Sequence, residues 1–578
     1  MSNMTNSGTI ALSPINSFLT RYNKLGQLSV LLSFTVLISC APDTTMDSDI
    51  FDSSEIAIAM QSITPDAIEG HIRVLADDSL EGRAPGTEGF EGASVYLESE
   101  MEKIGLMPMG PDGTFRQNVP LQESIVNEDE SGLSMSVNDE TRVFTYAEDF
   151  TLSPNASKTE VSVTGEVVFA GYGVSAPELG YDDYANIDVT GKIVLYLSGS
   201  PAMMPSTQRA YYSSGAVKNQ EASARGAVGI MSFTYPEDPR FRWNVRVATS
   251  RRGGFAWLDE NGSPRGRGGD SPILGSANLN HSLANALFEN SDVPIEAVFE
   301  AAAESTPQGF DLKTSVTITT SSRHRMVSSH NLIAKVEGSD PELKNEHVVY
   351  VAHLDHFGIG APDEDGDQIY NGAHDNASGT SIVLEVARAY SQLTDPPKRS
   401  ILFLFVTAEE WGLLGSDYFI NYPTVPKSSI VANMSLDMPF LYHPLLDIVP
   451  YGAEHSSLNE AITAATNHMD IAIGPDPIPE QVLFIRSDHY SFVRQGVPAL
   501  FIKSGFETGD ERDGGVMNSA FRTERYHTPN DEMDQGFDFG AGVSHAQVNF
   551  LTGYYVAMDD NRPTWNEGDF FGNIFGND

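Results

Sequence analysis

Five short segments of the chain carry, in order, imidazole and carboxylate side chains of the kind that hold a pair of zinc ions. The segments are AHLDH, GAHDNASG, TAEEWGLLGS, NMSLDM and RYHTPND. A two-zinc hydrolytic site needs about five or six nitrogen and oxygen ligands, and one further carboxylate to take a proton from water. The segments offer that number of groups, so the sequence predicts metal-assisted hydrolysis.

Two of the segments follow continuous apolar runs that predict buried strands. The run 347–352 leads into His353, and the run 400–407 leads into the pair Glu409 and Glu410. In open α/β sheets ligands bind at the carboxyl ends of the strands, so we expect these three side chains at one sheet edge. Because neighbouring side chains of an extended backbone point in opposite directions, one glutamate can face a metal ion while the other faces water.

The other candidate ligands follow similar patterns. Asp437 ends a third apolar run, 431–437, and Asp375 lies in a loop before the stretch 379–394, whose apolar residues have largely helical spacing. His527 lies in a polar loop that is long enough to fold back across a site. All three are therefore candidate metal ligands.

Two further residues are candidates for supporting roles. Asp355 comes two residues after His353, so we expect its side chain to project to the same side and to orient the His353 imidazole. Tyr526 precedes His527, and its hydroxyl could donate a hydrogen bond to a developing oxyanion. We therefore include both among the catalytic candidates.

The five segments together resemble the di-zinc aminopeptidases of metallopeptidase family 28, which includes leucyl-type aminopeptidases and the glutamate carboxypeptidase group. The resemblance implies an α/β fold, the zinc-exopeptidase α/β/α sandwich with a mixed central sheet. It also implies two zinc ions per chain and a role for each residue: His353 and Asp437 bind one ion, Glu410 and His527 bind the other, Asp375 bridges the two, and Glu409 is the general base. It further implies a cis peptide bond after Asp375.

Other histidines compete for the ligand positions. His489, in the string SDHYSF, is the chief rival, and His356 and His374 are weaker ones. The same string contains Ser487 and Asp488, but three adjacent residues do not place their side chains in the geometry of a hydrolytic triad. The favoured ligand set is therefore the one that the resemblance implies.

Several functions share this ligand set. An aminopeptidase acting on peptides is favoured, and a carboxypeptidase or dipeptidase would need, in addition, a cationic pocket for the terminal carboxylate. Glutaminyl cyclisation on a related fold generally uses a single zinc ion, so the full ligand set argues against it. A binding protein without activity typically lacks ligands or the base, and here every one is present.

The single cysteine, Cys40, excludes internal disulfides, thiol catalysis and CxxC zinc sites. It follows an apolar stretch, 25–38, that is preceded by basic residues and resembles a bacterial lipoprotein signal. The prediction is a signal peptide over 1–39, a lipid-bearing Cys40 and an acidic tether over 40–60. The enzyme would be exported and attached to the cell envelope, with the outer membrane as the expected location.

Pattern changes along the chain predict its domains. A helical N-terminal part of the peptidase domain is expected over 61–155, with a helix start at Thr64 and a helix over 89–104. The string LEGRAPGTEG within it resembles the N-terminal part of the same peptidase group. Short β-rich runs and the string AGYGVSAPELGYDDYANIDVTGKIVLYLSG resemble a protease-associated domain, inserted over 156–322. The catalytic domain is expected over 323–560 and a C-terminal tail over 561–578.

The chain is strongly acidic, with a formal net charge of −44 that makes nucleic acid an improbable partner and leaves peptides as the expected substrates. Seven arginines nevertheless cluster in the expected insertion: Arg240, Arg242, Arg246, Arg251, Arg252, Arg265 and Arg267. They could attract acidic peptide groups. Local pairing with the acidic surface is the commoner fate of such charges.

Overall fold

The computed structural model describes residues 48–138, 140–236, 238, 241–266, 273–363 and 365–576. The expected signal peptide and Cys40 lie outside the described residues. No helix within the described ranges is both long and apolar enough to cross a bilayer.

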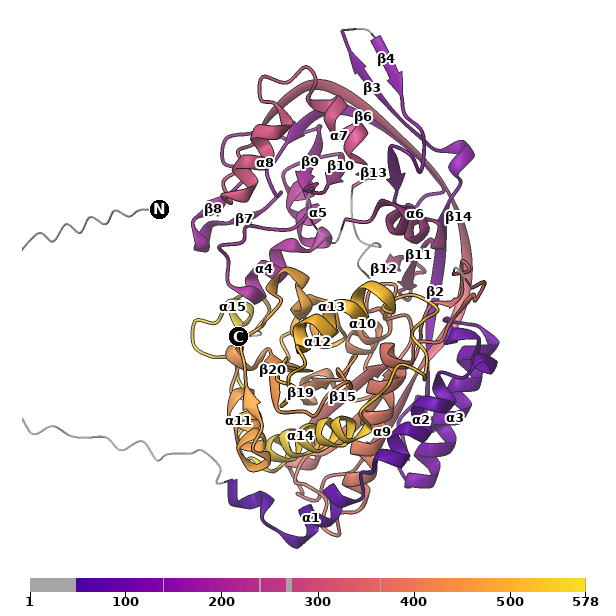
Figure 1. The fold of residues 1–578 in the computed structure, drawn as a ribbon, viewed down its shortest axis with the longest axis vertical. Helices are drawn as coiled ribbons and strands as arrows, with labels where there is room; N and C mark the ends of the chain where they lie inside the picture. The colour runs from indigo at the N-terminus through magenta and orange to yellow at the C-terminus, as the bar shows by residue number, and fades with distance from the viewer. Residues whose placement is uncertain are drawn as a thin grey trace, which may run out of the picture. The chain divides into compact units, whose positions relative to one another are not determined.

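A mixed sheet lies at the centre of the peptidase part of the chain (Figure 1). Its parallel strands are, in spatial order, β18 (Ser400–Val406), β15 (His347–His353), β19 (Ile430–Ser435) and β22 (Ala499–Ser504). The antiparallel strands β14 (Phe310–Val336) and β20 (Asp447–Tyr451) flank them on the two sides. The carboxyl ends of the parallel strands therefore meet at one edge, as the sequence predicts.

Both faces of this sheet are covered by helices. On β15, Val348 and Tyr350 pack into one core with α9 (Ser378–Ser391) and α14 (Phe539–Met558). Val349 joins a different core on the other face, with residues of α10 (Leu414–Asn421) and α12 (His489–Val493). Because every residue of β15 is buried, the strand has the continuous apolar sequence of a two-sided sheet. The predicted α/β/α sandwich is confirmed.

The N-terminal helices pack on the first of these cores. The helix α2 (Pro65–Leu75) begins after Thr64, whose side chain caps it, and α3 (Glu88–Ile104) ends at Gly105, which has φ +87°. Both helices lie close to their predicted positions.

Folded structure begins earlier than expected. The helix α1 (Ser54–Gln61) lies within the segment 40–60 that was expected to be a tether, and Phe51 before it is 2% exposed. Phe51, Ile56 and Ala59 join the main core because the segment, although acidic, has an apolar face. The tether prediction is therefore wrong for residues 48–60.

The helical prediction for 61–155 is wrong beyond Ile104. The strand β2 (Arg116–Val126) pairs antiparallel with β14, and β3 (Gly132–Val137), β4 (Glu140–Val143) and β5 (Phe150–Leu152) follow it. β3 pairs with β14, and β5 pairs with β13 (Gly275–Leu279). The strands β3, β4 and β5 thus belong to a second sheet, and their alternating half-buried residues gave no clear apolar run.

The second sheet belongs to an insertion that we call the inserted domain, residues 127–321. Its parallel strands, in spatial order, are β13, β10 (Gly229–Phe233), β9 (Ile193–Leu197) and β6 (Glu160–Phe169). The first half of β14 pairs with β6, and its second half pairs with β2 and β18. The insertion thus begins before residue 156, and one strand takes part in both sheets.

The inserted domain also contributes to the peptidase sheet. The strand β11 (Gly254–Leu258) pairs with β2, and Trp257 on it packs against Leu414. The indole Nε1 of Trp257 donates a hydrogen bond of 2.8 Å to the carboxylate of Asp417. This part of the insertion is therefore packed against the catalytic part of the chain.

The C-terminal segment is not a loose tail in the described range 561–576. It forms α15 (Phe570–Phe575), and Phe571 is fully buried. Asp569, which caps this helix, lies 2.6 Å from Nδ1 of His455, and Nε2 of His455 lies 3.0 Å from the hydroxyl of Thr207. Thr207 is on α4 (Ser206–Ser213) of the inserted domain, so the segment connects three parts of the chain.

Candidate metal centre

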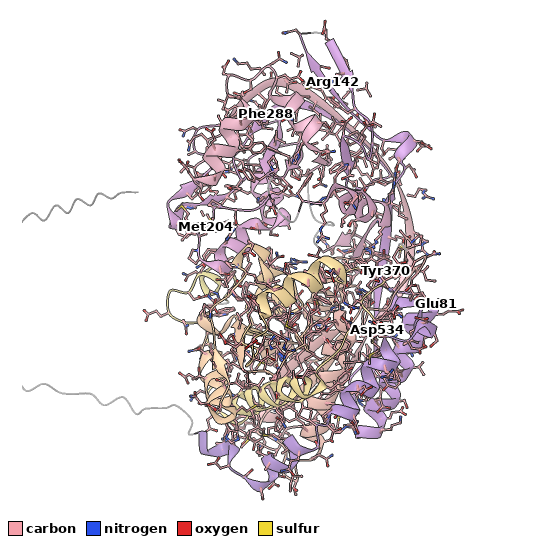
Figure 2. The ribbon with its side chains drawn as sticks, in the orientation of Figure 1. Glu81, Arg142, Met204, Phe288, Tyr370 and Asp534 are labelled. Atoms are coloured by element: carbon pink, nitrogen blue, oxygen red, sulfur yellow. The ribbon has the colours of Figure 1, made fainter. Side chains whose placement is uncertain are left out.

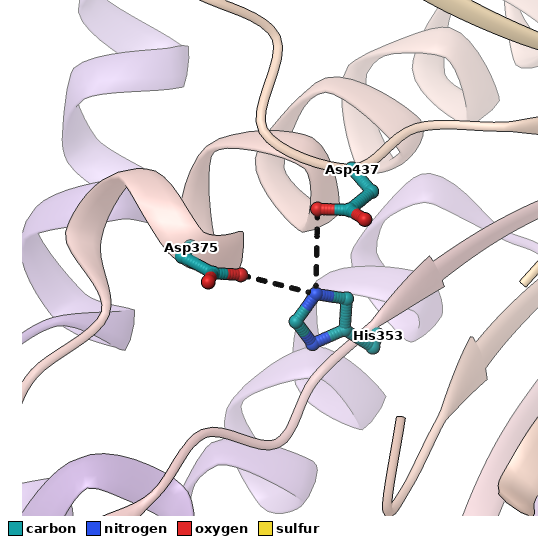
Figure 3. A group of neighbouring side chains, drawn as sticks. All are labelled: His353, Asp375 and Asp437. Atoms are coloured by element: carbon teal, nitrogen blue, oxygen red, sulfur yellow. Dashed lines mark ion pairs between the residues drawn. The ribbon is translucent and has the colours of Figure 1, made fainter. Parts of the chain in front are cut away.

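Three predicted ligands meet at the carboxyl edge of the sheet (Figure 3). His353 is the last residue of β15, Asp437 lies just after β19, and Asp375 lies just before α9. The Nε2 atom of His353 is 3.3 Å from Oδ1 of Asp375 and 3.6 Å from Oδ1 of Asp437. Two ligand atoms about 2.0–2.1 Å from one tetrahedral zinc ion are about 3.3 Å apart, so this spacing suits a zinc ion.

A second group lies on the other side of Asp375. The Nε2 atom of His527 is 3.2 Å from Oδ2 of Asp375 and 3.2 Å from Oε2 of Glu410. His356 also belongs here, because its Nδ1 lies 2.6 Å from Oε1 of Glu410 and it forms a possible metal-binding group with Glu410 and Asp375. His356, which the sequence ranked low, is therefore adjacent to the site.

Asp375 connects the two groups, since each of its carboxylate oxygens faces a different histidine. Burial alone would raise its pKa, but hydrogen bonds with His353 and His527 hold it well below its ordinary range. The pKa of His527, opposed by burial, is raised to about 9 by Glu410 and Asp375. A permanently charged carboxylate between two imidazoles is the arrangement expected of a bridging ligand.

The backbone around Asp375 is unusual and closely packed. The peptide bond between Asp375 and Asn376 is cis, as the resemblance implies. The Asn376 side chain donates to the carbonyl of Leu436 and accepts from the backbone N–H of Gly379. A Cβ atom on Gly379 would lie 2.2 Å from Oδ1 of Asn376, so the last glycine of GAHDNASG is required for this close approach.

Several of these buried atoms approach one another only as ion pairs and have no partner in full hydrogen-bond geometry. They are Nε2 of His353, Oε1 of Glu410, Oδ1 of Asp437 and both ring nitrogens of His356. Buried polar atoms are normally satisfied, and here they converge on two small volumes. Imidazole and carboxylate are also the ligand types that zinc prefers when cysteine is absent, so the residues fit this metal.

Glu409 is placed apart from the ligands of the second group. Its Oε2 lies 4.0 Å from Nε2 of His353, and burial, together with the nearby carboxylates, raises its pKa well above the ordinary value. The strand β18 ends before it, and Ala408 has φ +55°, so the backbone turns here. The expectation of an extended backbone is therefore wrong, although the two glutamates do face different groups.

Asp355 acts through different atoms than predicted. Nδ1 of His353 lies 3.0 Å from the backbone carbonyl of Asp355, whereas the carboxylate accepts hydrogen bonds from the backbone N–H groups of Glu409 and Glu410. The chain turns after β15, which points the carboxylate of Asp355 toward the glutamate turn. Asp355 thus orients the imidazole through its main chain and positions both glutamates through its side chain.

Tyr526 lies against the second group. Its ring stacks on His527 with the centroids 3.6 Å apart, and its hydroxyl accepts a hydrogen bond of 2.8 Å from Arg486. Burial raises the pKa of Tyr526, so it stays protonated and can donate. This placement is compatible with the predicted role at an oxyanion.

Two supporting residues were missed from the sequence. The carboxylate of Asp531 accepts hydrogen bonds of 2.9 Å from the backbone N–H groups of His374 and Asp375. Arg83 is 1% exposed and donates to four carbonyl oxygens, those of Leu75, Leu354, Asn371 and Gly372. The strings RYHTPND and LEGRAPGTEG contain these residues, but only the fold shows what they contact.

Arg83 belongs to a tight segment that packs against the loop before Asp375. The neighbouring Gly82 has φ +66°, and a Cβ atom there would lie 2.5 Å from the carbonyl oxygen of Tyr370. Glu81, which precedes Gly82, and Tyr370 are labelled in Figure 2. The segment therefore supports the site, as its resemblance to the peptidase N-terminus led us to expect.

The other rival histidines lie outside the two groups. His489 stacks on Phe501, and burial lowers its pKa to about 3. His374 packs beside the rings of Tyr442 and Phe537, and burial likewise lowers its pKa to about 3. Both are thus aromatic core residues.

The arginines of the inserted domain have different partners. Arg240 and Arg267 lie outside the described residues. Arg251 pairs with Glu128, and Arg265 pairs with Asp259, as the commoner interpretation predicts. Others approach the catalytic part: Arg252 lies over the ring of Phe357 at 4.4 Å, and Arg242 donates to the carbonyl of Arg522. Arg246 lies on α6 (Trp243–Arg252), between Arg242 and Arg252 in the sequence.

A mixed sheet with imidazole and carboxylate groups at its carboxyl edge can hold metal ions that activate water for hydrolysis. Residues 331–550, which contain all the predicted ligands, match the family model described as Peptidase family M28.

Individual relatives are more distant. The chain is 26% identical over 231 residues to a probable leucine aminopeptidase 2 of Aspergillus oryzae, covering 38% of this chain and 43% of the relative. It is 29% identical over 212 residues to leupeptin-inactivating enzyme 1 of Streptomyces exfoliatus, covering 36% and 44%. The chain thus spans less than half the length of these relatives.

One solved structure shares the fold over most of both chains. It is an aminopeptidase from Aneurinibacillus sp. strain AM-1, with a TM-score of 0.51 and 18% identity, and the alignment covers 87% of this chain and 96% of that one. The similarity extends through the inserted domain as well as the catalytic part.

Proposed function

We propose that the chain is a two-zinc exopeptidase that removes N-terminal amino acids from peptides. The observation that carries the proposal is the convergence of His353, Asp375, Glu410, Asp437 and His527 around two volumes that share the Asp375 carboxylate. Aminopeptidases among the relatives of the catalytic region support the direction of cleavage.

The residues of the centre have different roles in the proposed hydrolysis. Two zinc ions, when bound, would polarise the scissile carbonyl and lower the pKa of a water molecule. Glu409 belongs to neither group of candidate ligands, and its pKa is raised. It accepts the proton of the attacking water and then passes it to the leaving amine. The Tyr526 hydroxyl donates a hydrogen bond to the oxygen that gains charge. Asp355 keeps both glutamates in position through their backbone N–H groups.

The test is hydrolysis of amino-acid p-nitroanilides by the full chain, beside N-blocked dipeptides with a free C-terminus. Release of p-nitroaniline that is lost on chelation, restored by zinc, and reduced about 10²- to 10⁴-fold in Glu409→Gln would support the proposal. Cleavage of the blocked dipeptides alone would move the assignment to a carboxypeptidase. No turnover of either set by zinc-loaded protein would favour a cyclase or a receptor.

We also propose that residues 1–39 are a lipoprotein signal and that Cys40 carries a lipid that attaches the exported enzyme to the cell envelope. The support is the apolar stretch 25–38, its basic flank and the single cysteine. Mass spectrometry of the N-terminal peptide tests it. A diacylglyceryl mass on Cys40 is expected, and an intact sequence through Cys40 would contradict the proposal.

We further propose that the inserted domain is a protease-associated domain that guides substrates to the catalytic part. Arg252 supports this role, because its guanidinium lies over the rings of Phe357 and Tyr370, and Phe357 contacts the ring of His527 at 4.7 Å. Arg252→Gln should raise KM for long peptides and leave amino-acid p-nitroanilides unaffected. Equal KM values for long peptides in both proteins would contradict it.

A further inference from the structure

Two arginines from different elements flank the ring of Tyr526. Arg486 follows the short helix η10 (Leu483–Ile485), and Arg522 lies on α13 (Gly514–Glu524). Their guanidinium carbons are 5.9 Å and 5.6 Å from the centre of the Tyr526 ring. Arg486 also donates to the Tyr526 hydroxyl, so both cations are held beside one aromatic side chain.

Neither guanidinium has a carboxylate within 4.0 Å among the residues that the structure describes. By contrast, Arg251, Arg265 and Arg494 each have an acidic partner, in a chain with 79 acidic and 35 basic residues. Partly buried charges are normally paired, because burial removes their hydration. The two positive guanidinium groups have no acidic partner at ion-pair distance in the described part of the chain, so they can bind an anion.

The electrostatic balance around the pair agrees with this geometry. Burial lowers the pKa of Arg522, Tyr526 opposes this, and the neighbouring Arg486 lowers it further. The pKa of Arg486 is instead raised by Tyr526 and, across a longer distance, by Glu409, Asp437 and Asp375. A bound anion would relieve the effects of burial and of Arg486 on Arg522. The planar guanidinium group matches a carboxylate better than an ammonium group does, because it offers two parallel N–H donors.

The pair is close to the candidate metal centre. The Tyr526 ring that it flanks stacks on His527 at 3.6 Å, and Nε2 of His527 is 3.2 Å from both Asp375 and Glu410. One aromatic ring therefore separates the arginines from a metal ligand. A substrate whose scissile bond is at the metal centre would bring the groups adjoining that bond within reach of the arginines.

We propose that Arg486 and Arg522 form a binding site for a substrate carboxylate, so that the enzyme prefers peptides with a carboxylate adjoining the bond that it cleaves. This inference rests on the proposed exopeptidase function and adds its substrate class. The carboxylate can be the free C-terminus of a dipeptide or an acidic side chain on either side of the scissile bond.

The test compares four substrates: Leu-Leu-amide, which has no carboxylate, Leu-Leu, Leu-Glu-amide and Glu-Leu-amide. Wild-type protein should hydrolyse at least one carboxylate substrate with a higher kcat/KM than Leu-Leu-amide. Arg522→Gln should lower kcat/KM for that substrate about 10- to 100-fold, mainly through KM, as expected for loss of charge-assisted hydrogen bonds. It should leave Leu-Leu-amide unchanged. The substrate affected identifies the source of the carboxylate.

Arg251→Gln is the matched control, because it removes an arginine that pairs with Glu128 in the inserted domain. It should change none of the four kinetic constants. Arg522→Lys keeps the charge without the planar fork and should recover part of the loss, which separates recognition from a folding defect. An equal loss on all four substrates in Arg522→Gln would overturn the proposal, because the arginines would then act through Tyr526 or the fold.

A binding measurement distinguishes failure of this inference from failure of the proposed function. N-acetylglutamate and the uncharged N-acetylglutamine amide are titrated calorimetrically into zinc-loaded wild type and Arg522→Gln. Binding of the carboxylate probe to wild type that is lost in the variant would support the site even if no peptide is hydrolysed. Equal affinity of both proteins for N-acetylglutamate would overturn it.

Discussion

Replacement of Arg83 by methionine should weaken metal binding although Arg83 touches no metal ligand side chain. Its guanidinium donates to the carbonyl of Leu354, which follows His353, and to the carbonyls of Asn371 and Gly372, which precede Asp375. A fourth hydrogen bond reaches Leu75 on α2. Arg83 thus ties two ligand-bearing loops to one helix, and methionine of similar length cannot replace these bonds.

The expected size of the effect follows from these contacts. A hydrogen bond from a charged group contributes about 1.5–3 kcal/mol, and the benefit of no longer burying a charge offsets part of that loss. We expect Arg83→Met to lower the free energy of unfolding by about 3–5 kcal/mol. Loss of groups that orient metal ligands typically weakens metal affinity about 10- to 100-fold, which is the expected change for zinc.

Arg399 provides the control for this experiment. It is as buried as Arg83, pairs with Glu346, and donates to the carbonyls of Val556 and Asn561, far from the ligands in the sequence. Arg399→Met should lose similar stability and keep its zinc affinity, measured by competition with a chromophoric chelator. Equal zinc affinities for Arg83→Met and wild type, with both variants destabilised alike, would refute a positioning role for Arg83.

Three further changes test other parts of the structure. His356→Gln should weaken zinc at the Glu410 side about 10- to 100-fold, so that dialysed protein retains fewer ions by elemental analysis than wild type; unchanged metal content would exclude a role for His356. Burial would raise the pKa of Asp569, but its bonds with His455 and Gly572 hold it below the ordinary 3.8, so its stabilising contribution is complete above pH 3.8 and is lost as the pH falls further. The difference in unfolding free energy between wild type and Asp569→Asn should therefore shrink on acidification below that value, and a constant difference would contradict the assignment. Phe571→Ala should lower the unfolding free energy by about 3–5 kcal/mol, measured by urea denaturation, because Phe571 is fully buried; an unchanged value would restore the interpretation of this segment as a tail.

The sequence was sufficient for features that depend on neighbouring residues. His353 and Asp437 follow apolar runs that form parallel strands, and parallel strands share a carboxyl edge, so their proximity could be predicted without any long-range contact. The start of α2 at Thr64 is equally local, because the cap and the following proline are adjacent. Patterns of this kind depend on strand and helix periodicity alone.

Features that depend on tertiary packing could not be predicted. Arg83 and Leu354 are 271 residues apart, and no local pattern connects them. The carboxylate of Asp355 faces the glutamates because the backbone turns at Ala408, and a left-handed alanine leaves no mark in the sequence. The pairing of Arg486 with Tyr526 likewise arises only when two distant loops meet.

The strand β14 has a mechanical consequence for the whole described unit. Its 27 residues pair with β6 and β3 at one end, and with β2 and β18 at the other, so the two sheets share one continuous stretch of backbone. A strand cannot slip in register by one residue without exchanging its buried and exposed side chains along its length. Fraying of either sheet at β14 is therefore resisted by the hydrogen bonds of the other. The inserted domain and the catalytic part should exchange their β14 amide hydrogens together, as a single cooperative unit.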